Sequence, residues 1–166
     1  MAEPTPREVA RAKNPHELFM LNLIAFHLLL TPAALALEIG AWGLALTPAL
    51  SRIVIAFIYL RARHAAAADE SPLVAGHWAV AWRRCRLLLL SYAITAAILL
   101  GGWGLIQGIE KESMQDIMFT VITRVGVMPV VIMVFVTAVL ESGAIYQAGR
   151  GEVPGERTAE YQPPPQ

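Results

Sequence analysis

Four long apolar runs dominate the chain and limit what it can fold into. They cover residues 18–37, 41–60, 87–106 and 117–140 of a chain of 166 residues. Each run holds about 20 residues or more, which is enough for a helix to cross a hydrocarbon core roughly 30 Å thick. A water-soluble domain of this size could not bury four such segments. The sequence therefore predicts an all-α fold, a polytopic integral membrane protein with four transmembrane helices.

The polar segments around these runs give the expected domain organisation. Residues 1–17 form an N-terminal segment, and residues 18–147 form the transmembrane domain. Within it, loop 63–86 carries apolar residues at helical spacing, which is typical of an amphipathic helix on the membrane surface. The polar, proline-rich tail, 148–166, is expected to be disordered. The four spans are predicted at 18–38, 42–62, 87–108 and 117–141.

Positive charge is distributed very unevenly between the segments that connect the spans. Ten lysine and arginine residues fall on the side that holds both termini and loop 63–86, and Lys111 alone falls on the other. Because cytoplasmic segments carry an excess of Lys and Arg, we expect both termini, loop 63–86 and the tail to be cytoplasmic. Abundant alanine, with arginine far in excess of lysine, favours a bacterial cytoplasmic (inner) membrane protein.

Charge and cysteine content argue against several classes of function. Basic and acidic residues number 13 each, so the net charge of zero argues against a nucleic-acid partner. Cys85 is the single cysteine, so an intramolecular disulfide is impossible. His64 and His77 have no cysteine at ligand spacing, and we predict no metal site. Nucleotide-binding, nucleophile-elbow and zinc-protease motifs are missing, so we do not expect an enzyme.

Two arginines inside the predicted spans, Arg52 and Arg124, are the first candidate site residues. An arginine at the centre of a span costs about 2.5–3.5 kcal/mol on insertion scales, so it usually faces a partner or water. As an ion-paired anchor, Arg52 would pair with Glu38. Alternatively, the two arginines line an outward-facing vestibule for an anion, or contact a partner subunit or a lipid phosphate. For Arg124 the candidate ion-pair partners are acidic residues at the outer end of its span: Glu110, Glu112 and Asp116.

The first span contains further polar candidates. His27 lies in the middle of this span, while Asn22 and Thr31 on the same segment indicate a polar seam that bonds across a helix interface. A haem b held by two histidines needs a second histidine at similar depth, and the other spans contain none. We therefore predict no cofactor, and keep haem b, completed by a partner subunit, as an alternative to a hydrogen-bonded His27.

Two features of the fourth span concern its geometry. Pro129, close to Gly126, predicts a kink. Glu141 lies at the cytoplasmic end of the span, where we expect it to pair with an arginine at the end of loop 63–86. The candidates are Arg83, Arg84 and Arg86.

Small size, short outer loops and faces of small residues favour an accessory or anchor subunit of a larger membrane complex. One alternative is a small homo-oligomeric transporter or channel that uses Arg52 and Arg124. Another is a haem- or quinone-binding redox anchor that uses His27. The expected partners are other membrane protein subunits or further copies of this chain, within the lipid bilayer.

Overall fold

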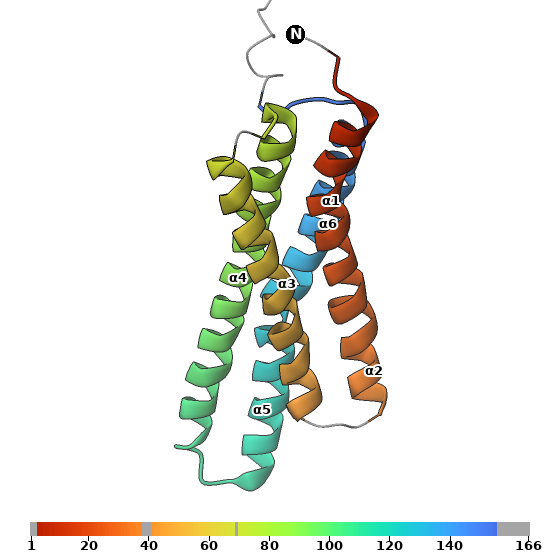
Figure 1. Ribbon diagram of the computed structural model, residues 1–166. Coiled ribbons are helices and arrows are strands. Elements are labelled where there is room, and N and C mark those ends of the chain that lie inside the picture. The colour runs from red at the N-terminus through yellow and green to blue at the C-terminus, as the bar shows by residue number, and fades with distance from the viewer. Residues whose placement is uncertain (1–2, 38–40, 69, 156–166) are drawn as a thin grey trace, which may run out of the picture. The chain divides into compact units, whose positions relative to one another are not determined.

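The structure is a computed structural model, and it describes residues 3–37, 41–68 and 70–155, with residues 35 and 41–44 described by their backbone alone. The described residues form helices with short connections and no strand. Four helical stretches are long and apolar enough to cross a membrane (Figure 1). The predicted fold class, an all-α multi-pass membrane protein, is confirmed. The four stretches are Pro6–Ala34, Ala45–Ala67, Pro72–Ile106 and Glu112–Gly149.

The helical elements follow one another closely along the chain. They are α1 (Pro6–Asn22), the π-helix η1 (Leu23–Leu30), α2 (Thr31–Ala36), α3 (Ala41–Ala67), α4 (Pro72–Ile106), α5 (Glu112–Gly126) and α6 (Met128–Gly149). The chain divides into two compact units. The first unit holds the described residues up to Cys85 and from Ala138 onward, and the second unit is Arg86–Thr137.

The first helix begins well before the predicted span. Thr5 caps α1 in a capping box: its hydroxyl accepts from the backbone N–H of Glu8, and the Glu8 carboxylate accepts from the backbone N–H of Thr5. Pro6 occupies the first turn, where its missing N–H costs nothing. Segment 6–17 therefore continues into the membrane-spanning part as one helix.

Loop 63–86 differs from the amphipathic surface helix that we expected. α3 continues to Ala67 and α4 begins at Pro72, so only residues 68–71 connect them. The apolar residues of this segment belong to α4 itself, and Val74, Trp78 and Ala81 are buried within the first unit. The expectation was wrong because the apolar stripe of the segment has protein helices to pack against, and such packing buries it as well as a membrane surface would.

Part of the tail that we expected to be disordered is folded. α6 extends to Gly149, and Val153 packs against a small core of Ala12, Leu73 and Ala148. Gly151 has a φ of 69°, which allows the chain to turn back toward α1. An ion pair of 2.9 Å joins Arg150 and Glu152. The Tyr146 hydroxyl and the Glu152 carboxylate raise the pKa of Arg150. The remainder, 156–166, lies outside the described residues.

In the second unit, α4 and α5 pack through glycines. Ile122 of α5 lies against Gly102 of α4, and Leu99 of α4 lies against Gly126 of α5. Close to Pro129, where we predicted a kink, the helix is interrupted at one residue, since α5 ends at Gly126 and α6 begins at Met128. Pro129 lacks the N–H that an unbroken helix would need there.

Candidate functional site

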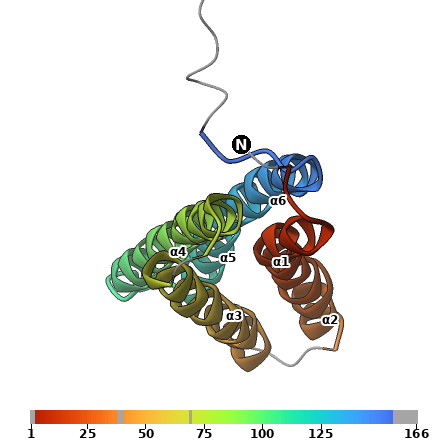
Figure 2. The ribbon, with the colours of Figure 1, turned by 45° about the horizontal axis from the view of Figure 1, so that its top comes forward.

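A chain of hydrogen-bonded side chains is buried inside the first unit. His16 of α1, His77 of α4 and Glu141 of α6 have no exposed surface. Nδ1 of His16 lies 2.5 Å from Oε2 of Glu141, and Nε2 of His16 lies 2.8 Å from Nδ1 of His77. Nε2 of His77 lies 3.0 Å from the Glu152 carbonyl oxygen. Three helices and the folded part of the tail are therefore joined by one polar network, where α1 and α6 lie side by side (Figure 2).

The hydrogen-bond pattern determines where the protons of this network lie. The carbonyl oxygen of Glu152 can only accept, so Nε2 of His77 carries a proton and donates it. In a neutral His77 ring, Nδ1 then accepts the bond from the Nε2–H of His16. A further proton must lie between Nδ1 of His16 and Oε2 of Glu141, because two lone pairs would repel at 2.5 Å.

Arg84 completes the network from the side of α4. Its guanidinium donates to Oε1 of Glu141 at 3.2 Å and to the Leu140 carbonyl oxygen at 2.8 Å. This contact places a guanidinium beside the carboxyl oxygen of Glu141 that His16 does not contact. The expected pairing of Glu141 with one of the three loop arginines is confirmed, and Arg84 is the partner.

The sequence did not reveal the two histidines of this network. We placed His16 and His77 outside the spans, and they are 61 residues apart in the chain. One signal was present, because His16 shares a helix face with Ala12 and Phe19, which are also buried. All four ring nitrogens of His16 and His77 take part in the hydrogen bonds described above. Among the described residues, no group of three or more His, Cys, Asp or Glu side chains could hold a metal ion.

The polar seam of the first span lies between this span and α3. Asn22 donates through Nδ2 to the Ser51 hydroxyl at 3.1 Å. The Thr31 hydroxyl donates to the Phe26 carbonyl oxygen and lies 2.8 Å from the Thr47 hydroxyl. These contacts agree with the seam expected from Asn22 and Thr31. Such bonds between membrane helices contribute roughly 0.6–2 kcal/mol each.

His27 lies in the π-helix η1, where its side chain is half-buried. A π-helical segment leaves the regular hydrogen-bond ladder of an α-helix, and such segments occur often at functional sites. Here the Phe26 carbonyl oxygen, one residue before His27, lies 3.1 Å from the Thr31 hydroxyl and 3.3 Å from the Thr47 hydroxyl. One of these two hydroxyls donates to it while the other donates across the contact between them. The irregular backbone therefore has its own bonding partners on α2 and α3.

The two intramembrane arginines belong to different units. Arg52 is exposed on α3 of the first unit, and Glu38, its expected partner, lies outside the described residues. Arg124 is exposed on α5 of the second unit. Within the part of the chain that the structure describes, it forms no ion pair with the three acidic residues that we proposed as partners. The nearest in sequence, Asp116, lies about 12 Å farther along the same helix, since each residue advances the axis by about 1.5 Å.

Instead, Arg124 belongs to a polar stripe along α5. Polar residues recur at intervals of four, which places them on one face of the helix, and each is exposed. The opposite face carries Ile122 and Gly126, which contact α4. We define the α5 polar stripe as Glu112, Asp116, Thr120 and Arg124. Its spacing was visible in the sequence, but we treated its acidic members only as possible partners of Arg124.

The fold and these polar clusters define a class, the multi-pass integral membrane proteins with polar groups inside and along their spans. The chain matches no protein-family model, no curated protein and no solved structure with which it was compared. The comparisons therefore assign no activity to it.

Proposed function

We propose that this protein is an accessory or anchor subunit of a larger membrane complex in the bacterial cytoplasmic membrane. The α5 polar stripe is the observation that carries the proposal. It is exposed along a helical stretch that is long and apolar enough to cross a membrane. In the proposed complex, this stripe contacts a polar face on a partner subunit.

The energetic argument concerns depth in the bilayer. If the apolar part of the span begins at Ile117, Arg124 lies about 10 Å inside it and Thr120 about 5 Å inside it. Charged groups near a bilayer centre cost about 2.5–3.5 kcal/mol on insertion scales, and an arginine that faces lipid tails has no bonding partner there. Hydrogen bonds to a neighbouring helix remove this cost, and this is how polar residues join membrane helices.

The buried network favours a structural role for this protein over a role in proton transfer. Each ring nitrogen of His16 and His77 already has a bonding partner, and His16, His77 and Glu141 have no exposed surface. A fully satisfied buried network stabilises one arrangement of the helices. This is the property expected of a rigid subunit that presents a fixed face.

The α5 polar stripe also favours a second candidate, a homo-oligomeric transporter or channel. In that case the stripes of several copies would line a water-filled path, with Arg124 facing an anion. The two candidates differ in what lies next to Thr120, which is either a foreign subunit or another copy of the chain.

Photo-crosslinking tests the proposal at single positions. A photoreactive phenylalanine analogue is placed at Thr120 on the stripe, or at Phe119 as the matched control. Phe119 is 58 % exposed and lies at nearly the same depth, about 100° around the helix. We expect the Thr120 probe to form an adduct of defined mass with a foreign membrane protein, and the Phe119 probe to react mainly with lipid.

Two results would overturn the accessory function. An adduct between two copies of the chain at Thr120 would favour the transporter or channel. Equal labelling of lipid from both positions would show that the α5 polar stripe is not a protein interface. As a second readout, Arg124→Leu should release the partner in native mass spectrometry of gently extracted protein. Val125→Leu is its control, because Val125 is 58 % exposed on another face of α5.

A further inference from the structure

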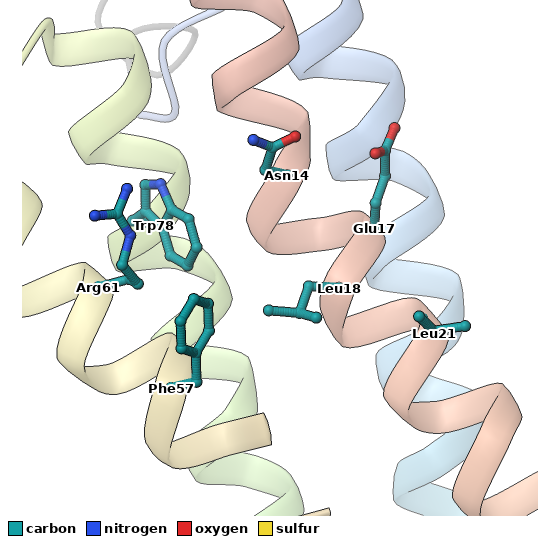
Figure 3. A pocket seen from close by; sticks show the side chains of 7 residues that line it. All are labelled: Asn14, Glu17, Leu18, Leu21, Phe57, Arg61 and Trp78. Atoms are coloured by element: carbon teal, nitrogen blue, oxygen red, sulfur yellow. The ribbon is translucent and has the colours of Figure 1, made fainter. Parts of the chain in front are cut away.

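A cavity of about 630 Å³ lies in the first unit between α1 on one side and α3 and α4 on the other (Figure 3). One part of its lining is apolar and consists of Leu18 and Leu21 of α1 and Phe57 of α3. Leu21 is 61 % exposed and Phe57 is 50 % exposed, so the cavity is open to the surroundings of the protein. All three residues lie within or at the edge of the apolar runs of the sequence.

The other part of the lining is polar. Asn14 and Glu17 come from α1, and Arg61 comes from α3. The Arg61 guanidinium lies over the ring of Trp78 of α4, 5.6 Å from the ring centroid, which restricts its position. Among the described residues, neither Glu17 nor Arg61 forms an ion pair. The lining of the cavity therefore includes one cation from α3, one anion from α1, and apolar surface from both helices.

We propose that this cavity binds a phospholipid with an ethanolamine headgroup, phosphatidylethanolamine. The phosphate contacts Arg61, and the ammonium group donates to the Glu17 carboxylate and the Asn14 side-chain oxygen. One acyl chain follows Leu18, Leu21 and Phe57 toward the bilayer interior. The volume lies within the usual range for small-molecule sites, roughly 300–1,000 Å³, so it accommodates a headgroup with part of one chain.

Charge complementarity distinguishes this lipid from the other common ones. Phosphatidylglycerol has a phosphate but no cation, and its binding would leave Glu17 beside an unbalanced negative charge. Phosphatidylcholine has a cation, but its quaternary nitrogen carries no N–H to donate to Glu17 or Asn14. The site therefore favours a headgroup that both accepts from a guanidinium and donates to a carboxylate.

Native mass spectrometry of the delipidated full-length protein tests the proposal. Phosphatidylethanolamine, phosphatidylglycerol and phosphatidylcholine with identical acyl chains are titrated separately. We expect the ethanolamine lipid to bind most tightly. Arg61→Gln should weaken its binding by about tenfold, the effect of losing one charge-assisted hydrogen bond. Arg63→Gln is the matched control, because Arg63 is exposed two residues further on and contacts Tyr59 instead.

A second variant tests the other half of the headgroup. Glu17→Gln should remove the preference for the ethanolamine lipid over phosphatidylglycerol, while circular dichroism and size-exclusion chromatography show an unchanged fold. Equal loss of binding in the Arg61 and Arg63 variants would overturn the site, as would tighter binding of phosphatidylglycerol to the unmodified protein. Competition by glycerophosphoethanolamine, which has no acyl chains, at the same concentration would overturn the role of the apolar wall.

Discussion

Glu141 is a carboxylate with no exposed surface, and its two oxygens are bonded to His16 and Arg84. Moving an unpaired charge into such a position would cost several kcal/mol. The network avoids this cost because each donor has an acceptor. At the scale of single residues, stability should therefore depend strongly on keeping the partners together.

We predict that Glu141→Leu lowers the free energy of unfolding by about 3–5 kcal/mol, because His16 and Arg84 lose their shared anion in a buried site. Denaturant titration of the purified protein in detergent measures the change. Ser142→Ala is the control, since Ser142 is exposed and its hydroxyl bonds within its own helix, so its effect should stay within about 0.5 kcal/mol. Equal effects of the two variants would contradict the role of the network. His16→Leu combined with Glu141→Leu should recover part of the loss.

At the scale of elements, the contact between α4 and α5 depends on which glycine of a neighbouring pair faces the partner helix. A Cβ atom at Gly102 would lie 2.3 Å from Cγ2 of Ile122, whereas one at Gly101 would meet nothing within 4 Å. Ile122 is branched at Cβ, so its side chain has few ways to move aside. The two glycines are neighbours in the same helix, and they differ only in the side of α4 that each one faces.

Gly102→Ala should therefore destabilise the protein by about 1–3 kcal/mol through overpacking. Gly101→Ala should be neutral or stabilising by up to about 1 kcal/mol, because alanine favours the helix more than glycine does. Thermal unfolding in detergent, monitored by circular dichroism, compares the two variants. Adding Ile122→Ala to Gly102→Ala should restore most of the lost stability, and failure to do so would mean that the strain lies elsewhere.

At the scale of the whole molecule, the excess of Lys and Arg predicts that both termini and the segment between α3 and α4 face the cytoplasm. Four membrane crossings are compatible with this orientation, because an even number returns the chain to the side where it began. Four helical stretches are long and apolar enough for these crossings: Pro6–Ala34, Ala45–Ala67, Pro72–Ile106 and Glu112–Gly149.

Labelling of intact cells with a membrane-impermeant maleimide tests this orientation. A cysteine introduced at Lys111, next to the start of α5, should be labelled from outside. A cysteine at Arg63, which is exposed near the end of α3 that leads to α4, should be labelled only after the membrane is opened. The native Cys85 is buried and should contribute little to either signal. The reverse pattern would show that the protein has the opposite orientation.

The candidate site was only partly predictable. An arginine partner for Glu141 could be predicted because this residue ends a span on the same side as three arginines. The polar seam of Asn22 and Thr31 could be predicted because both are polar residues inside an apolar run. His16 and His77 could not be paired by sequence, because their contact joins helices separated by 61 residues. The α5 polar stripe could have been predicted from its four-residue spacing alone.

The sequence by itself determined that the chain crosses a membrane as helices, because four runs of sufficient length have no other way to satisfy their backbone groups in lipid. The missing backbone donor of Pro129 also predicted a kink in the fourth span, and the helix is interrupted two residues before it. The tertiary structure decided which polar groups became neighbours, where α1 begins relative to the first apolar run, and that the residues around Glu152 fold back onto His77. These outcomes depend on side-chain contacts between distant segments, and local spacing carries no information about such contacts.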